Sequence, residues 1–417
     1  MTSFMAKAVM KMEIISKEII KPSFPTPSHL KTYKLSLLDQ LTLHSYTPLL
    51  LSYESESSTS SDILKESLSE ILTKYYPFAG RLQKDGITVH CGDDGVVFVE
   101  AKVLGCGLAD FLRNPTYDMQ KLLFPESFLW KGSCIDQSFL AAQVTSFEGG
   151  GMVVTVCISH KVADGCTIAT FLSDWAALAR GEVRPLPMII ARSISSPNLG
   201  YTVPEIVLDK SSTCVTKRYV FDAKKIAKLK NSVAELVENP TKVQVVTAHL
   251  YKCAIAASLK KTGSFTKSTW IQMVNMRPRM NQPLPDNSIG NFSWYFTISN
   301  NDQTERSLSS FVLDLKEGIK EVCNGGDNLD LSDWLINVRE FAGNVKELFD
   351  DLDVYRCTSF CRRPYYEMDF GWGYPKWVTM ADVQVKNTFV LFDTPDGDGI
   401  EAMVSLEEDG MRHFQCN

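Results

Sequence analysis

The chain has 417 residues, of which 44% are hydrophobic and 22% are charged, and its formal net charge is −6. These values are ordinary for a globular protein, and the length is sufficient for two or three domains. Because an acidic chain lacks the basic footprint that phosphate backbones require, we expect no nucleic-acid partner.

Neither the beginning of the chain nor its cysteines indicate export or metal binding. Lys7 and Lys11 interrupt the apolar residues of 1–12, which therefore lack the core of a signal peptide, and no apolar run is long enough to span a membrane. The eleven cysteines are scattered, and the closest pair, Cys357 and Cys361, is too isolated for a zinc site. We expect a cytoplasmic protein with reduced thiols, no metal and no membrane partner.

The first half of the chain alternates between helical and strand patterns. Residues 52–61 form a Ser/Glu-rich surface loop, and the apolar spacing from Leu64 to Tyr75 predicts a helix that stops before Pro77. Residues 152–158 are β-branched and apolar, which predicts a buried strand. From Cys166 the spacing is again helical until Arg180 and a C′ glycine.

A proline-rich stretch at 182–216 separates the two halves, and we interpret it as a crossover linker between domains at 1–181 and 217–417. Beyond it, an amphipathic helix is expected after Asp222, with its apolar side running from Ile226 to Leu236. Thr241 and Gln244 form a capping box for another helix. Residues 387–392 and 400–405 predict strands joined by a hairpin turn. Strands mixed with helices in both halves, without a strict repeat, indicate an α+β or mixed α/β fold.

The stretch His160-Lys161-Val162-Ala163-Asp164-Gly165 places a histidine at the end of the strand predicted at 152–158. Histidine can take up a proton near neutral pH and return it, so His160 is a candidate general base. The same residues also fit a structural pair of His160 with Asp164. No G-x-S-x-G nucleophile motif occurs in the sequence, and Ser159 faces the opposite side of a continuing strand.

A second motif, Asp369-Phe370-Gly371-Trp372-Gly373, describes a tight loop that approaches another backbone closely. An HxxxDG motif followed by DFGWG, in this order and at this separation, resembles the BAHD family of plant acyl-CoA-dependent acyltransferases. The pattern is most similar to the branch that contains vinorine synthase, capsaicin-type synthases and acylsugar acyltransferases. Three further segments carry the resemblance, at residues 20–40, 75–82 and 275–291.

The resemblance implies two domains like those of chloramphenicol acetyltransferase, with a solvent channel between them. It implies that a monomeric enzyme, with no bound cofactor, moves an acyl group from acyl-CoA to a hydroxyl of a small plant metabolite. Acetyl-CoA is the expected co-substrate, and the acceptor is expected to be an alkaloid, a terpenoid or an acylsugar.

The resemblance also implies roles for individual residues. His160 is expected to act as the general base in direct transfer without an acyl-enzyme. Asp164 is expected to turn away from it and to form a structural pair with Arg277. Ser36 and His44 are candidates for the acceptor pocket. The remaining motif residues are expected to support the site without joining the chemistry: Gly165, Asp369, Gly371, Trp372 and Gly373.

Two other functions are open at this point. A peptide-condensation domain shares the histidine and the Asp-Gly pair, but that class usually carries a second histidine where this chain has Ser159. A non-catalytic or regulatory homologue is the other alternative, although His160, Asp164, Gly165 and Arg277 are all intact.

Overall fold

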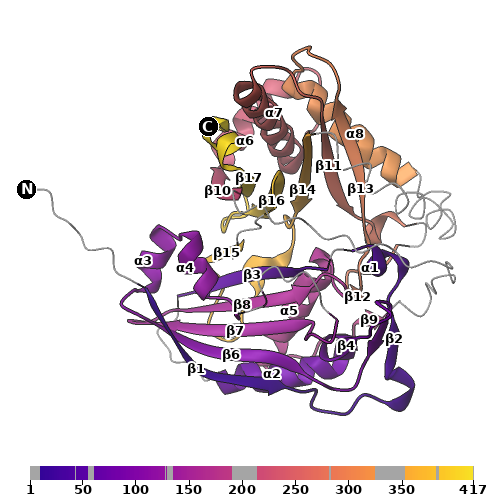
Figure 1. The fold of residues 1–417 in the computed structure, drawn as a ribbon, viewed down its shortest axis with the longest axis vertical. Coiled ribbons are helices and arrows are strands. Elements are labelled where there is room, and N and C mark those ends of the chain that lie inside the picture. Colours follow the sequence, from indigo (N-terminus) through magenta and orange to yellow (C-terminus); the bar gives the residue numbers. More distant parts are fainter. Residues whose placement is uncertain are drawn as a thin grey trace, which may run out of the picture.

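The computed structural model describes residues 10–42, 44–54, 61–126, 128, 135–189, 214–280, 283–324, 353–381 and 385–416. Two six-stranded sheets, one above the other in Figure 1, organise these residues. Each sheet combines parallel and antiparallel pairs, and helices cover both, as expected for a mixed α/β fold.

The first sheet has the strand order β1-β6-β7-β8-β3-β15. Only the pair of β6 and β7 is parallel. The strands span Lys11–Ile20 (β1), Tyr46–Tyr53 (β3), Val96–Leu104 (β6), Leu140–Phe147 (β7), Met152–Ser159 (β8) and Trp377–Met380 (β15). A small three-stranded sheet beside it consists of Thr32–Lys34 (β2), Arg81–Leu82 (β4) and Thr88–His90 (β5).

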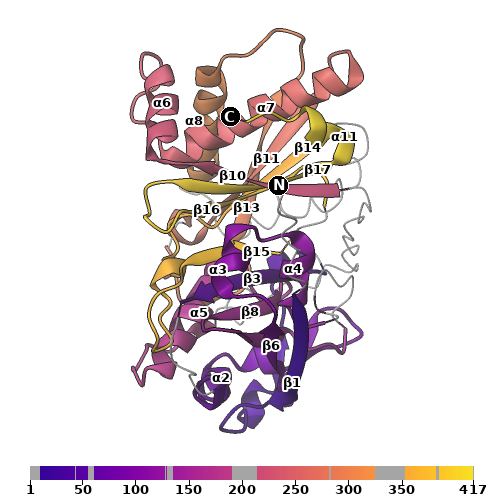
Figure 2. The same cartoon turned by 90° about the vertical axis from the view of Figure 1, so that its left-hand side faces the viewer.

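Helices cover both faces of the first sheet. The helices α2 (Ser61–Lys74) and α5 (Gly165–Ala179) pack together on one face. The helices α3 (Leu108–Arg113) and α4 (Tyr117–Leu122) lie on the face toward the second sheet (Figure 2). The short helix α1 (Leu37–Leu41) precedes β3. The helix predicted from Leu64 is confirmed as part of α2, whereas Ser52, expected in a surface loop, is fully buried in β3.

The strand–turn–helix unit around His160 follows the sequence prediction. All eight residues of β8 are buried, which explains the continuous apolar run. The carboxylate of Asp164 accepts from the backbone N–H groups of Cys166 and Thr167 and so caps α5. After α5, Gly181 adopts a positive φ of 77°, as expected for a glycine that ends a helix.

The second sheet has the order β10-β17-β16-β14-β11-β13. Its strands span Cys214–Phe221 (β10), Ser268–Asn275 (β11), Ser293–Asn300 (β13), Asp353–Ser359 (β14), Thr388–Asp393 (β16) and Ile400–Glu407 (β17). The predicted hairpin is confirmed, because β16 and β17 pair antiparallel. A separate parallel pair joins Met188–Ile189 (β9) to Ser288–Ile289 (β12).

The helices of the second half lie on the face of its sheet that points away from the first half (Figures 1 and 2). They span Ala223–Val233 (α6), Lys242–Thr262 (α7), Leu308–Asn324 (α8) and Glu408–His413 (α11). The helix predicted after Asp222 is confirmed, with Asp222 as its N-cap, and so is the capping box predicted at Thr241. Leu236 is 69% exposed and not on the packed side, because α6 ends at Val233.

The strand β15 connects the two halves in an unexpected way. It lies beyond residue 217, yet it pairs with β3 and forms an edge of the first sheet. The segment from the helical turn Pro364–Glu367 to Met380 therefore contributes to the hydrophobic core of the first half. The expected division into domains at 1–181 and 217–417 therefore changes in one respect: residues 364–380 belong to the first half. Most of the expected linker, residues 190–213, lies outside the described residues.

Candidate active site

His160 lies directly after β8, in the turn that leads into α5. Its backbone N–H donates to the carbonyl of Ser45 at 2.8 Å, which ties the turn to the start of β3. The residue is partly exposed, while the strand behind it is buried. The histidine is therefore held on rigid secondary structure with part of its surface open.

Asn291, from the second half, contacts His160 at two points. Its Oδ1 lies 3.0 Å from His160 Nδ1, and its Nδ2 donates to the His160 carbonyl at 2.7 Å. Nδ2 also donates to Asp39 Oδ1 at 2.8 Å. Because a carbonyl and a carboxylate only accept, they fix the orientation of the amide, and Oδ1 must accept from Nδ1–H. This tautomer leaves the Nε2 lone pair of His160 available as a base.

Asp39 supports Asn291 from α1. It is 1% exposed, and its Oδ1 also accepts from the backbone N–H of Asn291 at 2.8 Å. Its Oδ2 accepts from the backbone N–H and the hydroxyl of Ser36 at 2.9 and 2.7 Å, in a capping box at the N-terminus of α1. Burial raises the pKa of Asp39, although the hydrogen bonds from Ser36 and Asn291 oppose the shift.

Lys161 fixes the other end of α1. Its side chain is 3% exposed, and its Nζ donates to the carbonyl of Gln40 at 2.8 Å. The residue after the histidine thus holds the helix that carries Asp39. The positions of His160, Asn291 and Asp39 therefore depend on one another.

Asp164 forms a buried ion pair with Arg277, as expected. The guanidinium donates to both carboxylate oxygens, at 2.7 and 3.1 Å, and the two side chains are 2% and 0% exposed. The backbone N–H of Phe292 donates to Asp164 Oδ2 at 2.9 Å. Burial raises the pKa of Asp164, but Arg277 and these hydrogen bonds outweigh it, and the net pKa is below its usual range.

Arg277 also shapes the loop that carries Asn291. It donates to the carbonyls of Ser288 and Gly290 at 2.9 and 3.0 Å, and its guanidinium lies 4.7 Å from the centre of the Phe292 ring. The pair of Asp164 and Arg277 thus joins the start of α5 to this loop. It acts on His160 indirectly, through the placement of Asn291.

The electrostatic environment keeps His160 neutral. Burial lowers the pKa of His160 below its usual value of about 6.5, and this effect exceeds the opposing influence of Asp164 and Asn291. A histidine with this pKa is unprotonated at neutral pH, so it can accept a proton from a substrate hydroxyl.

Neither nucleophile beside His160 is suited to covalent catalysis. Ser159 is fully buried in β8, and its Oγ accepts from the backbone N–H of Lys161 at 3.4 Å. Cys157 is also fully buried, and burial raises the pKa of its thiol, which disfavours the reactive thiolate.

The loop from Asp369 to Gly373 lies at the other end of β3 and β8. Asp369 Oδ1 accepts from the backbone N–H groups of Gly371 and Gly373 at 2.7 and 2.8 Å, and both glycines have positive φ, at 108° and 101°. Phe370 packs against Trp175, with ring centres 5.1 Å apart, and stacks on Trp372.

The register of the first sheet sets the distance between this loop and His160. The hydroxyl of Tyr53 donates to the carbonyl of Met368, beside the loop, and Tyr53 pairs with Met152, at the start of β8. A strand of eight residues spans roughly 25 Å. The loop therefore lies at the opposite end of these strands from His160, and its role as structural support without a part in the chemistry stays a prediction.

Three further candidates take structural positions or remain untested. The carbonyl of Gly165 accepts from the hydroxyl of Tyr365 at 3.2 Å, and a Cβ on Gly165 would meet the ring of Phe360 at 3.1 Å. The Ser36 hydroxyl is engaged in the capping box, so it positions Asp39. His44 is partly exposed between α1 and β3, and its role in an acceptor pocket stays a prediction.

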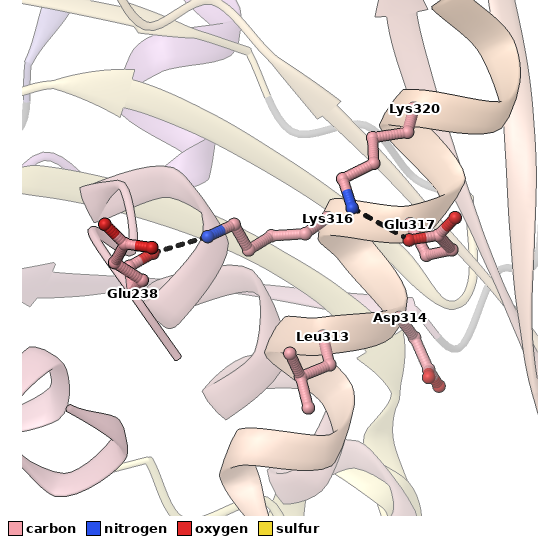
Figure 3. A pocket seen from close by; sticks show the side chains of 6 residues that line it. All are labelled: Glu238, Leu313, Asp314, Lys316, Glu317 and Lys320. Atoms are coloured by element: carbon pink, nitrogen blue, oxygen red, sulfur yellow. Dashed lines mark hydrogen bonds and ion pairs between the residues drawn. The ribbon is translucent and has the colours of Figure 1, made fainter. Parts of the chain in front are cut away.

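Two hollows occur in the described part of the chain, one between the two sheets and one on the surface of α8. One, of about 100 Å³, lies between the sheets and is lined by residues of both, including Arg218 of β10 and Trp377 of β15, whose guanidinium and ring centre are 5.3 Å apart. The other lies on α8 and is lined mainly by charged side chains (Figure 3). There Lys320 and Glu317 are more than half exposed and pair at 3.1 Å, as expected for a solvated surface.

No helix in the described ranges combines the length and the apolar composition that a bilayer crossing requires.

Comparisons with known proteins agree with the architecture and the motifs. Residues 10–417 match the model of a family described as "Transferase family". Akuammiline synthase 1 from Alstonia scholaris is 41% identical, over 97% of this chain and 96% of its own length. A Strychnos nux-vomica enzyme named 17,18-epoxy-17-hydroxycur-19-ene N-malonyltransferase is 39% identical, over 98% and 89%. Deacetylvindoline O-acetyltransferase from Catharanthus roseus is 36% identical, over 99% and 97%.

Among solved structures, vinorine synthase superposes with a TM-score of 0.84 at 33% identity, and the match covers 97% of each chain. This agreement confirms the predicted fold, a pair of domains that each resemble chloramphenicol acetyltransferase.

Proposed function

Because the chain belongs to the BAHD transferase family and is therefore an acyl-CoA-dependent acyltransferase of plant specialised metabolism, we propose that it transfers an acetyl group from acetyl-CoA to a hydroxyl. The acceptor is a specialised metabolite such as an alkaloid, a terpenoid or an acylsugar. The family assignment argues against a peptide-condensation domain, and the neutral His160 beside the intact pair of Asp164 and Arg277 argues against a non-catalytic homologue.

The observation that carries the proposal is the contact of His160 Nδ1 with Asn291 Oδ1, which assigns the tautomer of the ring. With Nδ1–H bonded to Asn291, the Nε2 lone pair is free and the imidazole is neutral at cellular pH. A neutral imidazole on a rigid turn can act as a general base, which contributes roughly 10²- to 10⁴-fold to the rate.

The reaction needs no covalent intermediate. Nε2 accepts the hydroxyl proton while the acceptor oxygen attacks the thioester carbonyl and forms a tetrahedral intermediate. The carbon–sulfur bond then breaks, the ester is released, and the CoA thiolate takes the proton back from the imidazolium. Asn291 supports this step, because its carbonyl oxygen can stabilise the positive charge on the ring through Nδ1–H.

The junction of the two halves is the place where we propose that both substrates meet. His160 comes from the first half and Asn291 from the second, and the hollow beside Trp377 shows that the sheets are not packed together everywhere. A channel along this junction would bring acyl-CoA and acceptor to Nε2 from separate openings. We further propose a monomeric enzyme that works in the cytoplasm.

A two-donor screen tests the proposal. The purified chain is incubated with acetyl-CoA or malonyl-CoA and a panel of hydroxylated and amine-bearing plant metabolites, and mass spectrometry detects the added acyl group. We expect ester products with acetyl-CoA, and none with the His160→Ala variant. Transfer of malonyl alone would contradict acetyl-CoA as the donor, and transfer to amines alone would contradict a hydroxyl as the acceptor. The N-malonyltransferase among the relatives illustrates both outcomes.

A further inference from the structure

Three potential metal ligands meet on the outer side of the second half, away from the candidate active site. His249 and Cys253 lie one turn apart on α7, and Cys416 follows α11 near the end of the chain. His249 Nε2 and Cys253 Sγ are 3.7 Å apart, and the three donor atoms lie within 4.8 Å of one another. Because Cys416 is far from His249 and Cys253 in the sequence, the spacing of the residues does not predict this cluster.

The surrounding aromatic residues hold these ligands in place. Phe414 packs edge-on against Tyr219, with ring centres 5.3 Å apart, and so anchors the segment that carries Cys416. The Tyr219 hydroxyl donates to the sulfur of Met411 in α11 at 3.6 Å. On the other side, the ring of Phe221 meets His249 edge-on at 5.9 Å. The cluster is therefore assembled by packing rather than by a chance contact at the surface.

The cluster offers the donor atoms that thiophilic cations prefer. Cys253 and Cys416 supply two sulfurs and His249 supplies a ring nitrogen, and these atoms come from two separate segments of the chain. Cysteine binds metal ions as the thiolate and histidine binds them as the neutral imidazole.

We propose that His249, Cys253 and Cys416 form a binding site for a thiophilic divalent cation, with Zn²⁺ as the best fit. Zinc prefers tetrahedral sites of imidazole and thiolate ligands with bonds of about 2.0–2.3 Å, which place neighbouring donor atoms roughly 3.5–3.8 Å apart. The pair of His249 and Cys253 already has this spacing. Because cysteine binds the ion as the thiolate, binding releases thiol protons, and water completes the fourth position.

A bound ion would connect α7 directly to the C-terminal segment. This segment is otherwise held by packing, since Phe414 and Cys416 are each 4% exposed. The role is structural and independent of acyl transfer, because the site shares no residue with the network around His160. Its main consequence is a stability of the second half that depends on the metal.

The experiment uses the full chain, reduced and freed of metal with a chelator. Zn²⁺ is titrated in competition with a chromophoric indicator, and Co²⁺ serves as a spectroscopic probe of tetrahedral thiolate coordination. We expect one equivalent of Zn²⁺ per chain, a higher melting temperature with Zn²⁺, and a sulfur-to-cobalt charge-transfer band. His249→Gln, Cys253→Ser and Cys416→Ser should each weaken binding by more than the ~10- to 100-fold that loss of an outer-shell partner costs.

Cys323→Ser is the matched control, because Cys323 is also partly exposed but lies on α8, outside the cluster. It should bind Zn²⁺ like the unaltered chain. Using three ligand variants keeps the test decisive if one of them fails to fold, as judged by circular dichroism. Undiminished Zn²⁺ affinity in a folded ligand variant would overturn the proposal. So would a reduced chain that binds no Zn²⁺ while the oxidised chain contains a Cys253–Cys416 disulfide, which would identify a redox pair instead.

Discussion

Asn291 holds His160 at both its ring and its backbone, with Oδ1 3.0 Å from Nδ1 and Nδ2 donating to the carbonyl at 2.7 Å. One amide from the second half therefore sets both the tautomer and the position of a base from the first half. Asp39 in α1 fixes the orientation of that amide, and the amide in turn fixes the His160 ring. The orientation of the reacting nitrogen therefore depends on Asp39 as well as on Asn291.

The first prediction is that Asn291→Ala lowers kcat by about 10- to 100-fold, part of the 10²- to 10⁴-fold that a general base provides. The KM for acyl-CoA should change little, because Asn291 acts through His160. Initial rates over a range of acyl-CoA concentrations separate the two effects. Asn287→Ala is the control from the same loop, since its side chain donates to the carbonyl of Leu186 at the surface and is not part of the network around His160. Equal losses in both variants would argue against a specific role of Asn291.

The second prediction concerns the ion pair of Asp164 and Arg277. Each single substitution to Ala should lower the free energy of unfolding by about 3–5 kcal/mol, because it leaves one buried charge unpaired. The double variant should lose less than the sum. Denaturant unfolding at pH 7 suits the measurement. The lowered pKa of Asp164 means that its stabilisation is present above the unfolded pKa and is lost as pH falls through the folded pKa. Strictly additive losses would refute the coupling.

The third prediction is a pH profile. Because burial lowers the pKa of His160, the imidazole stays neutral down to pH values below about 6.5. The ratio kcat/KM should thus be flat above this value and fall only in more acidic buffer, as the base becomes protonated. Assays from pH 5 to 8.5, with circular dichroism at each pH to confirm folding, test this. A midpoint above 6.5 would be incompatible with a desolvated neutral base.

The fourth prediction distinguishes direct transfer from a covalent intermediate. With Ser159 and Cys157 both fully buried, acyl-CoA and acceptor should bind together before the acyl group moves. Double-reciprocal plots at several acceptor concentrations should intersect. Parallel lines, or an acyl adduct detected by mass spectrometry without acceptor, would indicate a ping-pong mechanism.

The fifth prediction tests the structural role of Asp369. Removing its carboxylate leaves the N–H groups of Gly371 and Gly373 without their acceptor, so Asp369→Ala should cost about 1–3 kcal/mol of unfolding free energy. Asp369→Asn retains an oxygen acceptor and should cost less. Because the length of β8, roughly 25 Å, separates the loop from His160, the folded fraction of either variant should keep kcat within a few-fold. A much larger drop in kcat would assign this loop a part in the reaction.

The elements that position His160 were predictable because their signals are local. A buried strand, a capping carboxylate at Asp164 and a helix ending at Gly181 each depend on a few adjacent residues. Leu236 shows the limit of this reasoning, since an apolar residue that fits a helical period is still exposed when the helix has already ended.

Asn291 and Asp39 were not assigned a role from the sequence. Both lay within recognised segments, and Ser36-x-x-Asp39 fits a capping box, but a local cap does not reveal that the second carboxylate oxygen faces another domain. The contact between Asp39 and Asn291 joins residues 252 positions apart. Such a contact follows from the packing of the two halves, for which a single sequence carries no periodic signal.

The position of β15 has a consequence for the synthesis of the protein. Its partner β3 contains Leu49, Leu50 and Leu51, all fully buried, and its edge stays open until residues 377–380 pair with it. An unpaired apolar edge strand invites association with other chains. The first sheet therefore cannot be completed until nearly the whole polypeptide has left the ribosome, and the nascent N-terminal half depends on late folding or on chaperones for protection.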